Sequence, residues 1–177
     1  LESPGHHTAI HMSTSLNRTN HYSSTLSGAY RARATLHSAT LDGATLGSAD
    51  LYSATLYSAN LYGATLDSAD LCSATLYSAN LDRANLSRAT LDSANLDSAN
   101  LDSAILLGSQ LSTAQNLTRQ QLEGETAPLI SNTILPPALE AYQDRDRDRL
   151  PAVLHERYPQ EFDSIEAAEK CINDLKE

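Results

Sequence analysis

Leucine returns at every fifth position from Leu36 to Leu111 without exception. Alanine precedes it by two positions from Ala34 to Ala104, a column that Ser109 breaks and Ala114 restores. An α-helix turns by about 500° over five residues, so these leucines would spiral around it, and a strand would send successive leucines to opposite faces. The pattern is satisfied if each pentapeptide forms one short side of a coil, with Leu and Ala facing inward and the other three positions facing outward.

The repeat has the form A-[DNT]-L-x-x, as in ANLYG at 59–63 and ANLDS at 94–98, and its leucine runs through sixteen unbroken copies. It resembles the repeat of the pentapeptide-repeat family. The resemblance implies an all-β solenoid: a right-handed quadrilateral parallel β-helix of pentapeptide repeats, with a C-terminal helical cap and tail. Four pentapeptides then complete one coil, and coils stack about 4.8 Å apart through backbone hydrogen bonds. Residues twenty apart become vertical neighbours, which predicts ladders such as Asn60, Asn80 and Asn100.

Departures from the repeat divide the chain into segments. We expect a disordered N-terminal segment over 1–13, the β-helix over 14–115 with a degenerate first coil over 14–33, a helical cap and extended arm over 116–137, and a helical acidic tail over 138–177. A cap is expected because the ends of such a stack carry unpaired backbone groups. Just before the cap, the outward residues Ile105 and Leu107 are apolar, as they would be if the cap or the tail covered them.

The tail carries two further patterns. Charges alternate from Asp144 to Arg149, which is typical of a solvated helix face. Ile165, Ala168, Ile172 and Leu175 follow helical spacing and form an amphipathic stripe. Such a stripe favours contact with its own domain, and contact with a partner is the alternative.

No apolar run approaches the roughly 18 to 20 residues that cross a bilayer, and residues 1–20 lack the apolar stretch of a signal peptide. We therefore expect a soluble protein with no membrane partner, with the cytoplasm favoured and the compartment itself unknown. The chain begins with Leu, which leaves a removed leader open.

The sequence shows no sign of catalytic chemistry. It has no Gly-rich phosphate loop and no nucleophile elbow, and the leucines fill the interior, so we expect a protein that is not an enzyme, with no catalytic residues and no cofactor. Cys72 and Cys171 lie in different segments and their spacing indicates neither a disulfide nor a zinc site. Cys72 stands at an outward position and is expected to be an exposed, unreactive thiol.

Histidines give no metal site either. His6, His7 and His11 come closest, but they lie in the N-terminal segment that we expect to be disordered, so no metal is expected. The remaining three are expected to be isolated: His21, His37 and His155.

The outward positions are the candidates for function. Tyr57 and Tyr77 fall on one face by the twenty-residue rule, with Tyr52 and Tyr62 on the faces either side, and tyrosine is enriched in interfaces. Aspartate takes the same position of later repeats and gives the rod an acidic end, with these members: Asp82, Asp92, Asp97 and Asp102. The two groups form the candidate surface for a protein partner of unknown identity. Alternatively, they only keep the rod soluble and support stacking.

The acidity suggests a second function, because some members of the resembled family protect DNA gyrase by imitating duplex DNA. The net charge is −10, but residues 14–115 hold eight Asp against five Arg, a net −3, while residues 116–177 hold thirteen acids against seven bases, a net −6. A phosphate mimic needs its charge along the rod. The sequence therefore favours a non-catalytic interaction scaffold, a monomer or a homodimer through a solenoid end, over a DNA mimic that binds a type II topoisomerase. No basic face indicates direct nucleic-acid binding.

Overall fold

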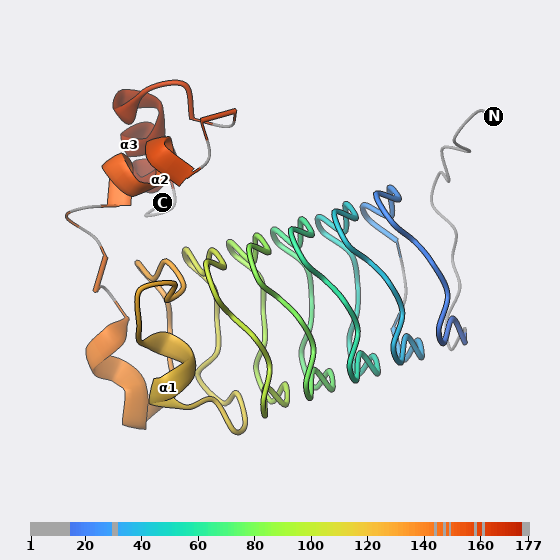
Figure 1. Cartoon of the computed structure of the whole chain (residues 1–177). Coiled ribbons are helices and arrows are strands. Elements are labelled where there is room, and N and C mark those ends of the chain that lie inside the picture. The colour runs from blue at the N-terminus through green and yellow to red at the C-terminus, as the bar shows by residue number, and fades with distance from the viewer. Residues whose placement is uncertain are drawn as a thin grey trace.

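The computed structural model describes residues 15–29, 32–143, 145–146, 148, 150–157, 159–160 and 162–174. From residue 15 to 115 the chain winds as a stack of coils that form a rod (Figure 1). Isolated parallel bridges join residues twenty apart, from Ser15 with Thr35 to Asn95 with Gln115, and the described residues contain no longer strand. Four pentapeptides therefore complete one coil. His6, His7 and His11, and the whole N-terminal segment over 1–13 that the sequence predicts to be disordered, lie outside the described residues.

Each pentapeptide binds the coils on both sides of it. The Leu56 N–H donates to the Thr75 carbonyl of one neighbouring coil (2.8 Å), and the Thr55 N–H donates to the Ala34 carbonyl of the other (2.8 Å). The Ala59 N–H donates back to the Leu56 carbonyl (3.0 Å) and closes a four-residue turn. Because each side of the coil is so short, a bridge forms at one residue per pentapeptide and turns separate the bridges.

The Asn or Asp before the leucine satisfies a further amide. The N–H of Tyr62 donates to Asn60 Oδ1 (3.2 Å), and the N–H of Cys72 donates to Asp70 Oδ1 (2.9 Å). This is the local turn that short Asx side chains favour. The preference for Asn and Asp in the repeat therefore has a local cause: the side chain binds the one backbone amide of the pentapeptide that neither the neighbouring coils nor the turn's own carbonyl binds.

The second residue after the leucine has a left-handed backbone. Ser58 has φ 52° and Ser73 has φ 59°, and Gly63 occupies the same position with φ 59°. A positive φ at the third residue of a turn is the geometry of a type II turn, which favours Gly and tolerates small polar residues. The second position after the leucine therefore faces outward but is restricted in backbone conformation.

The inward Leu and Ala columns form the core. Every leucine from Leu36 to Leu106 and every alanine from Ala34 to Ala104 is at most 3% exposed, and they belong to one cluster. The predicted asparagine ladder is confirmed, since Asn80 Nδ2 donates to Asn60 Oδ1 (3.1 Å) and Asn100 Nδ2 donates to Asn80 Oδ1 (3.4 Å).

Helix α1 (Arg119–Leu122) lies across the C-terminal end of the coils (Figure 1). Thr118 is its N-cap, with the Thr118 N–H and hydroxyl both donating to Gln121 Oε1. Gln121 Nε2 donates to the carbonyls of Leu96 (2.8 Å) and Ala99 (2.9 Å) in the last complete coil. Leu122 is buried in the same cluster as the repeat leucines.

After α1 the chain returns to the stack. Parallel bridges join Ile105 to Leu129 and Gln110 to Ile134, within the segment for which the sequence predicts a cap and an extended arm. The offset here is twenty-four residues, since α1 interrupts the repeat. The 3₁₀-helix η1 (Pro137–Tyr142) follows and buries Leu139 in the main cluster.

Two longer helices end the described chain: α2 (Leu150–Arg157) and α3 (Ile165–Asp174). Their buried residues form a second cluster with the outward residues Ile105 and Leu107 and with Leu129. The expectation that cap or tail covers Ile105 and Leu107 is therefore confirmed. Of the predicted stripe, Ala168 and Ile172 belong to this cluster, Ile165 is exposed, and residue 175 lies outside the described residues.

The prediction of a solvated helix face over residues 144–149 is wrong for Arg145 and Asp146. Asp146 is 0% exposed, Arg145 is half-buried, and neither lies in a helix. Arg145 Nη2 donates to Asp146 Oδ2 (2.9 Å) and to the Pro128 carbonyl (2.6 Å), and its Nη1 donates to the Leu122 carbonyl. The charges pair with each other and with backbone instead of with water.

Candidate partner-binding surface

The twenty-residue register places outward side chains in columns along the rod. One column holds His37, Tyr57 and Tyr77, and we call it the aromatic column. The rings of Tyr57 and Tyr77 stack in parallel, with centroids 5.3 Å apart and 2° between their planes. The ring of His37 lies against Tyr57 at 4.7 Å and 31°. The prediction that Tyr57 and Tyr77 share a face is confirmed, and Tyr57 is 39% exposed.

His37, which the sequence places outside any metal-binding group of histidines, makes two contacts with neighbouring coils. Its Nδ1 lies 3.1 Å from the Tyr57 carbonyl oxygen, and its N–H donates to Asn17 Oδ1 (3.0 Å). The coil register, which places residue 37 directly beside residue 57, was the signal that could have found this contact. His155 Nδ1 lies 2.9 Å from the Phe162 carbonyl oxygen.

The other two tyrosines lie in the columns on either side. Tyr52 is 43% exposed and precedes Cys72 in its column. Tyr62 is half-buried, and the Arg83 guanidinium lies 5.9 Å from its ring centroid, within cation–π distance. Three adjacent columns therefore present tyrosine on the middle coils.

The four aspartates lie in the same three columns as the tyrosines, on later coils. By the coil register, Asp82 and Asp102 continue the column of Tyr62, Asp97 continues the aromatic column, and Asp92 continues the column of Tyr52. Their contacts differ too: Asp92 accepts from the Ser112 hydroxyl (2.8 Å), and Asp97 accepts from the Ser98 hydroxyl (2.9 Å). The sequence placed these residues at the same step of the repeat, and the coil distributes them around the rod.

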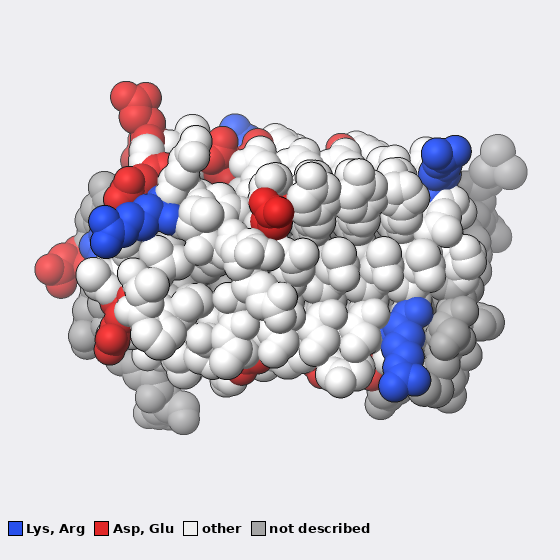
Figure 2. Space-filling view, turned by 90° about the horizontal axis from the view of Figure 1, so that it is seen from below, with Lys and Arg blue, Asp and Glu red and all other residues white. Residues whose placement is uncertain are grey.

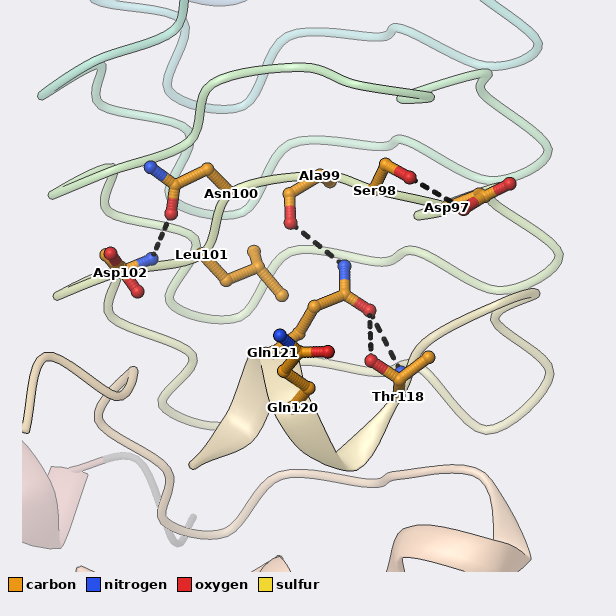
Figure 3. A pocket seen from close by; sticks show the side chains of 9 residues that line it. All are labelled: Asp97, Ser98, Ala99, Asn100, Leu101, Asp102, Thr118, Gln120 and Gln121. Carbon is orange, nitrogen blue, oxygen red and sulfur yellow. Dashed lines mark hydrogen bonds between the residues drawn. The ribbon is translucent and has the colours of Figure 1, made fainter. Parts of the chain in front are cut away.

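A groove opens where the rod meets α1. It has a volume of about 420 Å³ and is lined by residues 97–102 of the last complete coil and by Thr118, Gln120 and Gln121 (Figure 3). Asp97 and Asp102 lie at its two ends. Its lining is polar, with the buried Leu101 as its largest apolar member. Sequence reasoning missed this groove, although it included both aspartates in the candidate surface.

Charged side chains are sparse along the middle of the rod on the face shown in Figure 2, where most of them gather towards the two ends. A parallel backbone bridge joins Asp50 to Asp70 on the next coil, and Thr90 Oγ1 donates to Asp70 Oδ1 (3.2 Å).

No group of three or more His, Cys, Asp and Glu residues within the described ranges is placed to hold a metal ion. Among those same residues, no helix has the length and apolar character needed to cross a membrane.

Cys72 is half-buried instead of exposed. Burial raises the pKa of its thiol above the ordinary value of 9.0, and the Asp70 carboxylate adds to the rise, while a hydrogen bond with Thr90 opposes it. A raised pKa keeps the thiol protonated, and the thiolate is the nucleophile. The environment of Cys72 therefore makes it less reactive than a free thiol.

Alkylation of Cys72 by iodoacetamide should accordingly be slower at pH 8 than alkylation of a model peptide thiol, with the midpoint of its pH–rate profile above that of the model thiol. Peptide mass spectrometry follows Cys72 and Cys171 separately in the same sample. Asp70→Asn keeps an oxygen acceptor but removes the charge that raises the pKa, so the midpoint should move down in this variant. A Cys72 midpoint below that of the model thiol would contradict the prediction.

The model of the family described as pentapeptide repeats matches residues 32–67, 54–92 and 79–114, with eight copies. The protein alr5209, a pentapeptide repeat protein from Nostoc, is 33% identical, over 59% of this chain and 81% of its own, with a TM-score of 0.44. The chain belongs to the pentapeptide-repeat family.

Other solved pentapeptide-repeat structures are also similar. HetL from the cyanobacterium Nostoc, involved in heterocyst differentiation regulation, is 28% identical over 72% of this chain, with a TM-score of 0.31. This pentapeptide-repeat chain spans about half of HetL's length, 54%. QnrB1, a plasmid-mediated fluoroquinolone resistance protein, is 14% identical over 73% of this chain and 86% of its own, with a TM-score of 0.40. A search of curated proteins finds no match.

Proposed function

We propose that this protein is a non-catalytic scaffold: a right-handed, four-sided β-helix, with α1 packed on its C-terminal end, that binds a protein partner through the tyrosines of its middle coils. The observation that carries the proposal is the aromatic column, in which Tyr57 and Tyr77 stack in parallel at 5.3 Å while Tyr57 remains 39% exposed. Tyr52 and Tyr62 extend this surface onto the adjacent columns.

Rigidity supports this role. Binding costs free energy wherever side chains must be ordered, about 0.5–1.5 kcal/mol for each flexible one. The coil spacing already holds the aromatic rings against each other, and the backbone beneath them is hydrogen-bonded to both neighbouring coils. Tyrosine also supplies a large amphipathic contact area from only two side-chain torsions. A partner would therefore meet a preordered surface.

The distribution of charge favours the scaffold over the second candidate, a DNA mimic that binds a type II topoisomerase such as gyrase. Imitation of a phosphate backbone requires regularly spaced negative charge along the rod. Here the column with most aspartates, Asp42, Asp82 and Asp102, is interrupted by Tyr62, and Arg83 lies over that tyrosine. Unchanged gyrase supercoiling in the presence of excess protein would exclude the mimic.

Affinity capture tests the scaffold. Replacement of Tyr52, Tyr57, Tyr62 and Tyr77 by Ser should weaken binding of the captured partner at least about tenfold, since buried tyrosines are common hot spots of interfaces. Quantitative capture from source cells, followed by titration of the purified partner, measures the change. Tyr22→Ser is the control, because Tyr22 is 65% exposed and lies two coils before Tyr62 in the same column, on the first described coil. If the wild type, the four-tyrosine variant and Tyr22→Ser all bind the same partners with the same affinity, the tyrosines do not form the binding surface.

A further inference from the structure

The last complete coil has one bridge position without a partner. Its four bridge residues are 95, 100, 105 and 110, and three of them pair onward: Asn95 with Gln115, Ile105 with Leu129, and Gln110 with Ile134. Asn100 pairs back to Asn80 but has no onward bridge among the fully described residues 96–143. The side of the coil around Asn100 is therefore an open edge.

Helix α1 is the cause of this open edge. Residues 117–121 would form the next side of the coil if the repeat continued, but the chain turns into α1 there. Gln121 Nε2 takes up the carbonyls of Leu96 and Ala99, so the acceptors of the edge are satisfied. Two backbone N–H groups of the same edge have no acceptor among the described residues.

Two backbone donors are left over on the open edge. One coil earlier, the Ser78 N–H donates to the Asp97 carbonyl (2.9 Å) and the Leu81 N–H donates to the Asn100 carbonyl (2.8 Å). The equivalent amides of Ser98 and Leu101 have no hydrogen-bond partner among the residues described. Both residues line the groove of about 420 Å³. A ligand that fits this edge must bring hydrogen-bond acceptors.

Charge defines the ligand further. Asp97 and Asp102 lie at opposite ends of the groove (Figure 3), and the carboxylate of Asp102 is exposed and makes no ion pair with a described residue. An extended peptide presents backbone carbonyls for the free amides, as in the addition of a strand to an exposed sheet edge. Lysine or arginine on such a peptide would reach the two carboxylates.

We propose that this groove binds an extended, basic peptide segment of the partner protein, whose carbonyls accept from the Ser98 and Leu101 amides and whose cationic side chains pair with Asp97 and Asp102. This inference rests on the proposed function and names the part of the partner that the rod receives. The groove is continuous with the proposed surface, because Asp97 follows Tyr77 in the aromatic column.

The test uses the full chain and two probes, acetyl-Thr-Arg-Thr-Arg-Thr-amide and the same peptide with Glu in place of Arg. In ¹H–¹⁵N spectra the Arg peptide should give saturable shifts of the Ser98 and Leu101 amides and slow their hydrogen exchange. The double variant Asp97→Asn/Asp102→Asn should weaken the Arg peptide at least about tenfold, while the matched double variant Asp42→Asn/Asp67→Asn should leave its Kd unchanged. The Glu peptide should give no saturable shift.

Three outcomes would overturn the proposal: no saturable shift at Ser98 and Leu101, equal binding of the Arg and Glu peptides, or equal weakening by both double variants. Binding of the partner that is captured through the tyrosines distinguishes a failure of this proposal from a failure of the scaffold proposal. If that partner still binds Asp97→Asn/Asp102→Asn with full affinity while the Arg peptide fails, the groove proposal is wrong and the scaffold proposal stands. If the peptide binds as expected but capture is insensitive to the tyrosines, the scaffold surface is the proposal that fails.

Discussion

The variant Leu71→Lys should not fold. Leu71 is 0% exposed in a middle coil, and its interior neighbours by register are Leu51 and Leu91, which are also fully buried. The change forfeits about 2–3 kcal/mol of leucine burial and places an ammonium group where the described interior offers only leucine and alanine. The expected loss is at least about 5 kcal/mol, which is comparable with the whole stability of a typical domain. Because each coil contacts only its neighbours, the defect divides the stack into two shorter ones.

Far-UV circular dichroism and urea denaturation measure this effect. Ser73→Gly is the matched control two residues away, since Ser73 is exposed and its φ of 59° suits glycine. Relief of the left-handed backbone, about 1 kcal/mol, is offset by the greater freedom of glycine in the unfolded chain, about 0.5–1 kcal/mol, so the control should change stability by less than about 1 kcal/mol. A Leu71→Lys protein with the spectrum and urea midpoint of the control would show that Leu71 does not face the interior.

The core could be predicted from the sequence because burial in this fold follows a local rule. Each pentapeptide repeats the same geometry, so a leucine at every fifth position is sufficient to identify the interior column, and Leu36 to Leu106 are all buried as expected. The twenty-residue register then predicts contacts that are distant in sequence, such as the Asn60, Asn80 and Asn100 ladder and the stacked rings of Tyr57 and Tyr77.

The same periodicity does not reveal backbone conformation. An outward Ser73 suggests that any substitution there is silent, whereas its positive φ disfavours β-branched residues. The position of a residue within the five-residue repeat also does not say on which side of the rod its side chain lies. Asp82, Asp92 and Asp97 share one step of the repeat and lie in three different columns.

The groove and the tail depend on departures from the repeat, which periodicity cannot describe. The open edge at Asn100 exists only because α1 replaces one side of the next coil, and the length and direction of that helix depend on the contacts of Gln121 and Leu122 with the coils. Likewise, alternating charges have the same appearance in sequence whether they face water or bind buried carbonyls. The partners of Arg145 lie seventeen and twenty-three residues away, at Pro128 and Leu122.

The ion pair of the tail leads to the second large expected effect: Asp146→Ala should lower the free energy of unfolding by about 3 kcal/mol, the usual cost of breaking a buried pair. Asp146 Oδ2 accepts from the Ile130 N–H (3.0 Å) and pairs with Arg145 Nη2 (2.9 Å), and the Asp146 N–H donates to the Ile130 carbonyl (3.2 Å). Ile130 is 0% exposed, so alanine leaves its amide buried without an acceptor.

Hydrogen exchange and urea denaturation distinguish this effect from a general loss of charge. Exchange at Ile130 should accelerate strongly in Asp146→Ala, and Asp146→Asn, which keeps an oxygen acceptor but loses the charge, should fall between that variant and the wild type. Asp148→Ala is the matched control, because Asp148 belongs to the same alternating run but is exposed, and its effect should stay within about 0.5 kcal/mol. Equal destabilisation by Asp146→Ala and Asp148→Ala would mean that the pair is solvated, and that Ile130 and Leu122 are held in place by other contacts.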